Sequence, residues 1–322
     1  MIIPYQKTCI KWTIKKTSCI AVSARLRAAA IAADISPEKR LMYIERAARM
    51  ADCSNRIEYH YCPECGNLHV SRTNLCRDRL CPVCAWRLSL QRMGQMMRSL
   101  EWIYEKEGSL NGAMITLTIK NCPPDELSEA LDELTDAWAL LRHRRKIKRW
   151  VKGYARSIEV TAGKDGTLHP HLHVFVLWAA GYDKDITQRE ICDMWQESLQ
   201  VDYTPICDIR RAYSRKSSAE DAWTRTLEAV AECTKYALSG KLLKSCPENI
   251  IIPLAEGIKN RRLVAYGGSI AAARTALNYA DTDSPKDVED VSLDCPKCGF
   301  VGCFPLALEW AAGEYRPRLD YK

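Results

Sequence analysis

Leu168-His169-Pro170-His171-Leu172-His173-Val174-Phe175-Val176-Leu177 is the stretch that decides the fold. Half of the six histidines alternate here with apolar residues, and residues two apart on a β-strand point to the same side, roughly 7 Å apart. His171 and His173 could therefore hold one divalent ion on a sheet surface. Two imidazoles leave coordination positions open, which suits catalysis better than a structural role. Satisfied core histidines are the alternative, but three histidines in register favour a metal site.

The segments around this stretch predict an antiparallel hairpin. Residues 154–161 read as a strand, and the turn from Gly163 to Gly166 joins them to the histidine strand, which ends at Trp178. Further strands are expected at 113–119 and 203–211, and helices at 125–148, 187–199 and 218–238. The order β-α-β-β-α-β-α predicts an α+β fold, an antiparallel sheet with helices on one face.

Glu159 interrupts the apolar strand that faces the histidine strand. An unpaired buried carboxylate would be costly, and a metal would offset that cost. We therefore expect Glu159 to be the third ligand beside His171 and His173, a set that suits Mg²⁺ or Mn²⁺. A salt bridge to Arg156 is the alternative.

On the last expected helix, Glu228, Glu232 and Tyr236 are four residues apart and share one face. Lys235 and Lys241 flank the tyrosine. Neighbouring cations and a metal-polarised phosphate can help a phenol attack, and Glu232 could act as a general base towards water. A surface pair is the alternative, but the histidine strand upstream favours the catalytic interpretation.

The sixteen cysteines indicate zinc rather than disulfides, because they cluster in pairs and residues 1–16 do not resemble an export signal. Two Cys-x-x-Cys pairs, Cys62 with Cys65 and Cys81 with Cys84, are fifteen residues apart, as in zinc ribbons. Cys76 or Cys53 could replace a member of the first pair, and His69 is also near. The predicted structural zinc ligands are Cys62, Cys65, Cys76, Cys81 and Cys84. Cys295 and Cys298, with Cys303, could form a second zinc site that has no obvious fourth ligand.

The net charge is +7, and the cations gather in two patches. No acidic residue lies between Ala137 and Ile158, where cations alternate with Trp150 and Tyr154. Such a patch fits a surface that follows phosphates and stacks bases, although charge runs are usually solvated faces. The predicted DNA-binding residues are Arg144, Arg145, Lys148, Arg149, Lys152, Arg210, Arg211 and Lys235. No apolar run is long enough to span a membrane, so a cytoplasmic protein is expected.

Three regions are expected. Residues 1–100 would be helical and cysteine-rich, residues 101–250 would carry the histidine strand and Tyr236, and residues 251–322 would form a carboxy-terminal extension. That extension holds an acidic linker at 280–291 and the possible second zinc site.

Four ordered motifs resemble the plasmid rolling-circle replication initiators of the HUH endonuclease superfamily, in particular the single-tyrosine group of small Gram-positive-type plasmids. They are Ile115-Thr-Leu-Thr118, Ile158-Glu-Val-Thr161, His169-Pro-His-Leu-His173 and Glu232-Cys-Thr-Lys-Tyr236. The segments 76–87 and 260–268 also look like that family's cysteine and carboxy-terminal motifs. The resemblance covers roughly residues 50–270 and implies an HUH domain of the ferredoxin or RRM type.

The resemblance also implies the chemistry. His171, His173 and Glu159 would bind the metal that polarises the scissile phosphate, and His169 would support them. Tyr236 would attack at the double-strand origin, giving a 5′-phosphotyrosyl enzyme and a free 3′-OH, and Glu232 would activate water at termination. The implied partners are origin DNA, single-stranded or extruded from supercoiled plasmid, with host helicase and polymerase.

Two other functions stay open from the sequence. An HUH transposase or relaxase would use the same residues on different DNA. A non-catalytic, zinc-dependent nucleic-acid-binding protein would explain the cysteines and cations, but not the histidine strand with Glu159 and Tyr236.

Overall fold

The computed structural model describes residues 5–108, 110–163, 165–178, 186–211, 219–234, 238, 240–282, 284–285, 288–289 and 293–318. The chain forms two units, the first from residues 1–88 with 284–322 and the second from residues 89–283. This division differs from the three expected regions, because strands far apart in the sequence pair with each other. Residues 264–267 complete the sheet of the second unit, and residues 304–311 complete that of the first.

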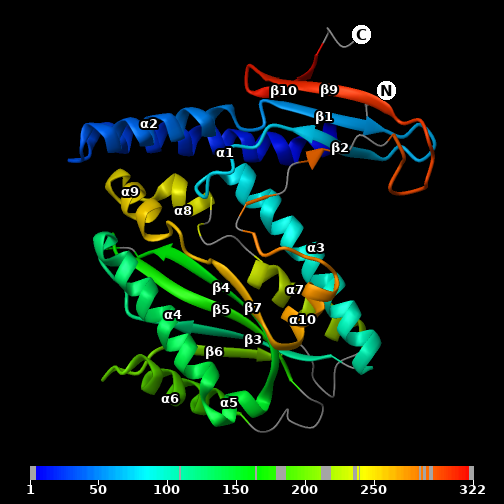
Figure 1. The fold of residues 1–322 in the computed structure, drawn as a ribbon. Coiled ribbons are helices and arrows are strands. Elements are labelled where there is room, and N and C mark those ends of the chain that lie inside the picture. Colours follow the sequence, from blue (N-terminus) through cyan, green and yellow to red (C-terminus); the bar gives the residue numbers. More distant parts are fainter. Residues whose placement is uncertain are drawn as a thin grey trace. The chain divides into compact units, whose positions relative to one another are not determined.

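The second unit is built on a five-stranded antiparallel sheet in the order β6-β3-β5-β4-β7 (Figure 1). Its strands are β3 (Asn111–Thr118), β4 (Val151–Ala162), β5 (Leu168–Trp178), β6 (Cys207–Arg211) and β7 (Val264–Gly267). The histidine strand β5 is central, between β3 and β4. The predicted α+β fold with an antiparallel sheet is confirmed.

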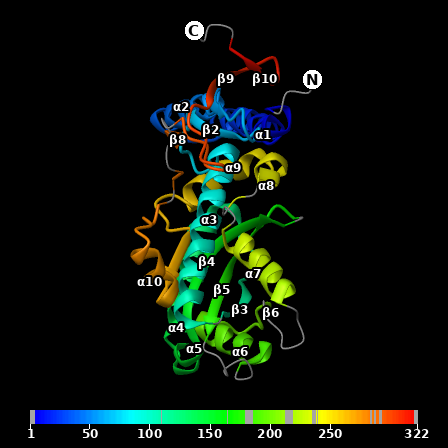
Figure 2. The ribbon, with the colours of Figure 1, turned by 90° about the vertical axis from the view of Figure 1, so that its right-hand side faces the viewer.

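Helices cover both faces of this sheet, which corrects the expectation that they lie on one face. Phe175 and Leu177 of β5 belong to a core shared with α3 (Pro82–Glu107), α7 (Ala219–Thr234) and α10 (Gly268–Ala276). The opposite face packs against α4 (Leu127–His143), which lies across the sheet from α7 (Figure 2). There the Trp138 ring meets Tyr154 of β4 edge-on. Because both faces are covered, β5 is buried along almost its whole length, which explains its apolar composition.

The remaining helices of the second unit flank the sheet. They are α5 (Arg145–Trp150), α6 (Gln188–Leu199), α8 (Gly240–Ser245) and α9 (Glu248–Gly257), with a 3₁₀ turn at Pro124–Glu126. The helix expected at 125–148 is split into α4 and α5, because Arg144 between them is extended (ψ 137°).

Gly267 and Gly268 end the 260–268 segment, and their close contacts with β4 explain why both positions are glycine. Gly268 has φ +60°, and a Cβ there would lie 1.9 Å from the Lys152 carbonyl oxygen. A Cβ on Gly267 would lie 2.2 Å from the Tyr154 ring. Any larger residue would therefore push β7 away from β4, so the motif closes the edge of the sheet.

The first unit combines two helices with a second antiparallel sheet. The helices are α1 (Tyr5–Ala32) and α2 (Pro37–Asp52), and Ser36 caps α2 by accepting from the Lys39 N–H. The strands β1 (Arg56–Tyr61), β2 (Leu68–Thr73), β8 (Val288–Glu289), β9 (Phe304–Ala311) and β10 (Glu314–Pro317) pair in the order β10-β9-β1-β2-β8. None of these strands was expected from the sequence. Within the described ranges, every helix is too short or too polar to cross a membrane.

Candidate metal and nicking site

The three expected metal ligands meet on one face of the β4–β5 hairpin. Glu159 on β4 is directly opposite His171 on β5, and His173 lies two residues further along β5. Alternation of side chains along the strands puts all three on the side that faces α7. Their ligand atoms lie within 4.8 Å of one another, so one ion could contact all three.

The Glu159 carboxylate is the acceptor that both imidazoles approach. Its Oε2 lies 2.9 Å from His173 Nε2 and 3.6 Å from His171 Nε2. Both histidines are 8% exposed, so water screens these contacts weakly. A proton on Nε2 and a divalent cation compete for the same position between these groups, and the donor set of two nitrogens and one oxygen suits a divalent cation.

The second nitrogen of each ring is held by a neighbour. His171 Nδ1 lies 3.3 Å from the His169 carbonyl oxygen, and His173 Nδ1 lies 3.3 Å from Thr116 Oγ1 on β3. A proton on each Nδ1 can be shared with these oxygens, which leaves Nε2 to face Glu159 and an ion. Thr116 entered the sequence analysis only as part of the 115–118 motif, with no role given to it. The signal was its alternation with Thr118 in a strand beside the histidines.

The salt bridge between Glu159 and Arg156 does not form. The two side chains are three positions apart on β4 and so point to opposite faces, and Arg156 donates to the Arg262 carbonyl oxygen at 3.2 Å. Burial raises the pKa of Glu159, but hydrogen bonds and charge from His171 and His173 outweigh it, so the pKa lies below its usual range. The carboxylate is therefore ionised, as a metal ligand must be.

We expect Thr116→Val to weaken Mn²⁺ binding about 10- to 100-fold, because it removes the oxygen that orients His173. Thr118→Val is the matched control, because that hydroxyl donates to the Ile206 carbonyl oxygen and to no histidine. Calorimetric titration of both variants with Mn²⁺ measures the effect. Equal affinities in the two variants would remove Thr116 from the site.

Glu232 reaches the same site from α7. Its Oε1 lies 3.5 Å from His173 Nε2, and its side chain is 33% exposed. A carboxylate so placed can take a proton from a group that enters from solvent. Tyr236 and Lys235, predicted as nucleophile and DNA contact, lie outside the described residues.

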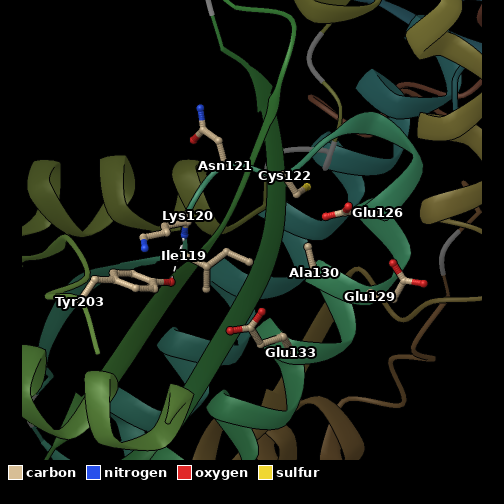
Figure 3. Close-up of a pocket in the computed structure, with 9 residues that line it drawn as sticks. All are labelled: Ile119, Lys120, Asn121, Cys122, Glu126, Glu129, Ala130, Glu133 and Tyr203. Atoms are coloured by element: carbon tan, nitrogen blue, oxygen red, sulfur yellow. Dashed lines mark hydrogen bonds between the residues drawn. The ribbon is translucent and has the colours of Figure 1, made fainter. Parts of the chain in front are cut away.

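His169 does not join the metal ligands. Its Nδ1 is hydrogen-bonded to Asn121 Oδ1 at 2.8 Å, and its ring stacks on His171. Asn121 also lines a pocket of 420 Å³, whose other walls include Glu126, Glu129 and Glu133 (Figure 3). These three carboxylates outnumber the one cation of the lining, Lys120, so the pocket disfavours a phosphate. The supporting role expected of His169 fits these contacts.

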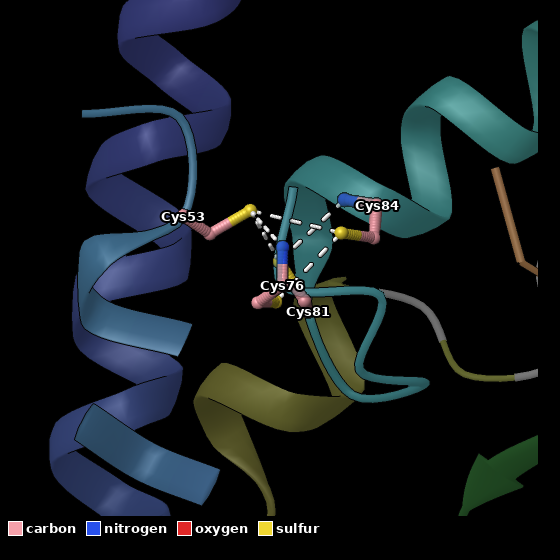
Figure 4. A group of neighbouring side chains, drawn as sticks. All are labelled: Cys53, Cys76, Cys81 and Cys84. Atoms are coloured by element: carbon pink, nitrogen blue, oxygen red, sulfur yellow. Dashed lines mark hydrogen bonds between the residues drawn. The ribbon is translucent and has the colours of Figure 1, made fainter. Parts of the chain in front are cut away.

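In the first unit, Cys53, Cys76, Cys81 and Cys84 form a four-thiol cluster that could hold zinc (Figure 4). The Sγ of Cys53 is 3.6 Å from that of Cys84 and 3.6 Å from that of Cys81, and the Sγ of Cys76 is 3.7 Å from that of Cys84. Two sulfurs on one tetrahedral zinc, each at about 2.3 Å, would lie about 3.8 Å apart. A disulfide would need about 2.05 Å, so the spacing fits an ion.

Several hydrogen-bond donors lie beside this cluster of thiols. The N–H groups of Cys76 and Arg77 donate to the sulfurs of Cys53 and Cys84 at 3.4 and 3.2 Å. The buried Lys16 ammonium donates to the Ala51 and Cys53 carbonyl oxygens at 2.6 and 2.7 Å. Such donors stabilise the negative charge that thiolate ligands bring.

The expected pairing of Cys62 and Cys65 with Cys81 and Cys84 on one ion is wrong. Cys53 and Cys76 complete the first cluster instead, because α2 ends at Cys53 beside the turn that holds Cys81. Cys62 and Cys65 lie in a second four-thiol group with Cys295 and Cys298. Cys303 packs beside Cys62 and Cys295 but is not a member of that group.

Among the described residues, only some of the predicted DNA-binding cations are free of ion pairs with acidic residues. Arg144, Lys152 and Arg210 form ion pairs with Glu197, Glu107 and Asp208. Arg145, Lys148 and Arg149 are exposed on α5, and the side chain of Arg211 is not described.

Two tryptophans near these cations, Trp138 and Trp150, do not offer stacking surfaces. Trp150 is 3% exposed and stacks on Trp178, and Trp138 is 5% exposed. Moreover, α5 precedes β4, and Glu159 lies eight residues into that strand, which places it about 26 Å from the start of the strand. Cations on α5 could therefore contact phosphates away from the reacting centre, but not the scissile one.

The fold and the site together define a class: an α+β protein whose central antiparallel strands bring together two histidines and a carboxylate that could hold a metal ion. The family model described as "Replication protein" matches residues 67–313. The chain belongs to this replication protein family, which confirms the resemblance to plasmid replication initiators.

Three relatives align with most of this chain. A Protein rep of Bacillus amyloliquefaciens is 30% identical over 295 residues, covering 86% of each chain. A Protein rep of Lentilactobacillus hilgardii is 28% identical over 253 residues, covering 76% of this chain and 79% of the relative. One from Streptococcus pneumoniae serotype 2 is 30% identical over 227 residues, covering 69% of each. No solved structure matches.

Proposed function

We propose that this replication initiator is an HUH-type nickase that cuts one strand of plasmid origin DNA and starts rolling-circle replication. One observation carries the proposal. Glu232 lies 3.5 Å from His173, beside the ligand set His171, His173 and Glu159. It comes from α7, a distant part of the chain. Tyr236 follows Glu232 by four residues in the sequence.

In this mechanism the Tyr236 phenol oxygen attacks the scissile phosphorus. The phenol gives up its proton as the 5′-phosphotyrosyl ester forms, the P–O3′ bond breaks, and the released 3′-oxygen takes up a proton to become the 3′-OH that primes synthesis. A bound Mg²⁺ or Mn²⁺ would supply Lewis-acid polarisation of the phosphate. Arg145, Lys148 and Arg149 would contact phosphates further along the strand.

Glu232 would act in the second cleavage, at termination. Its carboxylate takes a proton from water, and the resulting hydroxide attacks the second scissile phosphorus. The P–O3′ bond there breaks, and the leaving 3′-oxygen takes back the proton that Glu232 holds. Its exposure of 33% leaves it accessible to solvent, while its contact with His173 keeps it beside the metal ligands. A host helicase and polymerase would extend the primed strand.

A labelled single-stranded oligonucleotide of the plasmid's own origin, with Mn²⁺, tests the proposal. We expect an SDS-resistant protein–DNA adduct. With Glu232→Gln the adduct should still form, while water-dependent release slows by roughly 10²- to 10⁴-fold. Glu228→Gln, on an exposed residue one turn earlier in α7, should leave release unchanged.

Absence of any adduct would favour a non-catalytic origin-binding protein. Cleavage of mobile-element ends in preference to the origin would favour the transposase or relaxase alternative. The replication proteins among the relatives support the initiator over both.

A further inference from the structure

Two copies of one turn lie far apart in the sequence. Cys62-Pro-Glu-Cys65-Gly66 and Cys295-Pro-Lys-Cys298-Gly299 share the pattern Cys-Pro-x-Cys-Gly. In each, the glycine N–H donates to the carbonyl of the first cysteine, at 3.0 and 2.8 Å. Both glycines have positive φ, +66° and +74°, which the turn requires.

The similarity between the two turns extends to the residue that follows each glycine. The N–H of Cys62 donates to the Asn67 carbonyl oxygen at 2.9 Å, and that of Cys295 donates to the Phe300 carbonyl oxygen at 2.7 Å. Two segments with unrelated neighbours have therefore adopted the same closed loop, which presents two sulfurs to one side.

Strand pairing brings the two turns together. β1 and β9 are antiparallel, with Tyr61 opposite Phe304 at the end of the ladder. Cys62 follows Tyr61 directly, and the 295–299 turn lies a few residues before Phe304. The register of the sheet thus places both turns at one end of the β1–β9 pair.

The four sulfurs have the spacing of a metal site. The Sγ of Cys62 is 3.6 Å from that of Cys298, and the Sγ of Cys65 is 3.6 Å from that of Cys295. The sulfurs all lie within 4.8 Å of one another. As in the first cluster, this is near the separation of about 3.8 Å that tetrahedral zinc imposes and well beyond a disulfide.

We propose that Cys62, Cys65, Cys295 and Cys298 bind a second zinc ion, and that this ion fastens residues 293–318 to the β1–β2 hairpin. Three of these thiols are largely shielded from solvent, whereas Cys298 is exposed. The nearby apolar contacts are few, Phe300 among them, so the ion is the main bond between the two turns. The proposal does not depend on the nicking mechanism.

Zinc content tests this proposal. The full-length chain is prepared with His171→Ala and His173→Ala, so that the histidine site does not contribute, and zinc per chain is measured by mass spectrometry. We expect two zinc ions, and one after the further change Cys298→Ser. Cys303→Ser is the matched control, a buried cysteine beside the site, and should retain two. A Cys298→Ser protein that keeps two zinc ions, or a parent that holds only one and loses none, would overturn the proposal.

Two further measurements guard against simple misfolding. Cys298→His keeps a zinc donor and should restore two ions, with a cobalt-substituted spectrum shifted from four sulfurs towards three sulfurs and one nitrogen. In Cys298→Ser, hydrogen exchange should rise in β9 and β1 but not in β5. Unchanged protection of β9 together with lost zinc would show that the ion does not fasten this segment.

Discussion

Phenylalanine in place of Tyr236 is expected to abolish the covalent protein–DNA adduct and to slow origin nicking by roughly 10⁴-fold or more, as removal of a nucleophile does elsewhere. The change removes one oxygen and keeps the ring. The sequence places Tyr236 four residues after Glu232, whose carboxylate lies 3.5 Å from His173. No other residue in the proposed mechanism can form the phosphotyrosyl bond.

Tyr154→Phe is the control for this prediction. Tyr154 is on β4, the strand of Glu159, but it packs against Trp138 on the opposite face of the sheet. It should keep full adduct formation, measured on the same labelled origin strand in denaturing gels. An adduct that survives Tyr236→Phe would mean that another side chain is the nucleophile.

Alanine in place of His173 should lower the nicking rate on the order of 1,000-fold. Loss of metal polarisation removes several kcal/mol of transition-state stabilisation, and each 1.36 kcal/mol is about tenfold. His173 contacts both carboxylates of the site, Glu159 at 2.9 Å and Glu232 at 3.5 Å. Its removal therefore leaves two neighbouring carboxylates without the imidazole between them.

Mn²⁺ titration separates this effect from a loss of folding. The variant should lose tight Mn²⁺ binding while its thermal unfolding stays cooperative. His143→Ala, on an exposed histidine at the end of α4, should bind Mn²⁺ and nick as the parent does. Normal Mn²⁺ affinity in His173→Ala would show that the metal binds elsewhere.

The central hairpin was predictable because its signals are local. Alternating histidines, the turn at Gly166 and the isolated Glu159 fix strand, turn and register within twenty residues, and the structure pairs Glu159 with His171. The sequence predicted only that Glu232 and Tyr236 share one face of a helix. It did not predict that Glu232 lies close to His173, because α7 packs on the sheet through residues distant in sequence.

The first unit was not predictable in the same way. β1 and β2 are short and largely polar, and β1 finds its other partner in β9 about 240 residues later. The group of Cys62, Cys65, Cys295 and Cys298 depends on that pairing, so the spacing of the cysteines along the chain pointed to the wrong set. The expectation that aromatic residues among the cations stack on bases was not met at Trp150 for another reason. Composition does not tell whether Trp150 stacks on a base or, as here, on Trp178.

The interrupted first unit has a consequence for biosynthesis. The side chain of Arg92 donates to the Thr282 carbonyl oxygen at 3.2 Å, so the two ends of the second unit lie side by side, as in a domain inserted into a host domain. A nascent chain thus holds every strand of the β6-β3-β5-β4-β7 sheet while β9, Cys295 and Cys298 are still untranslated. The inserted domain can fold first, and translation that stops early would release a chain with His171 and His173 in place and its host domain unfinished.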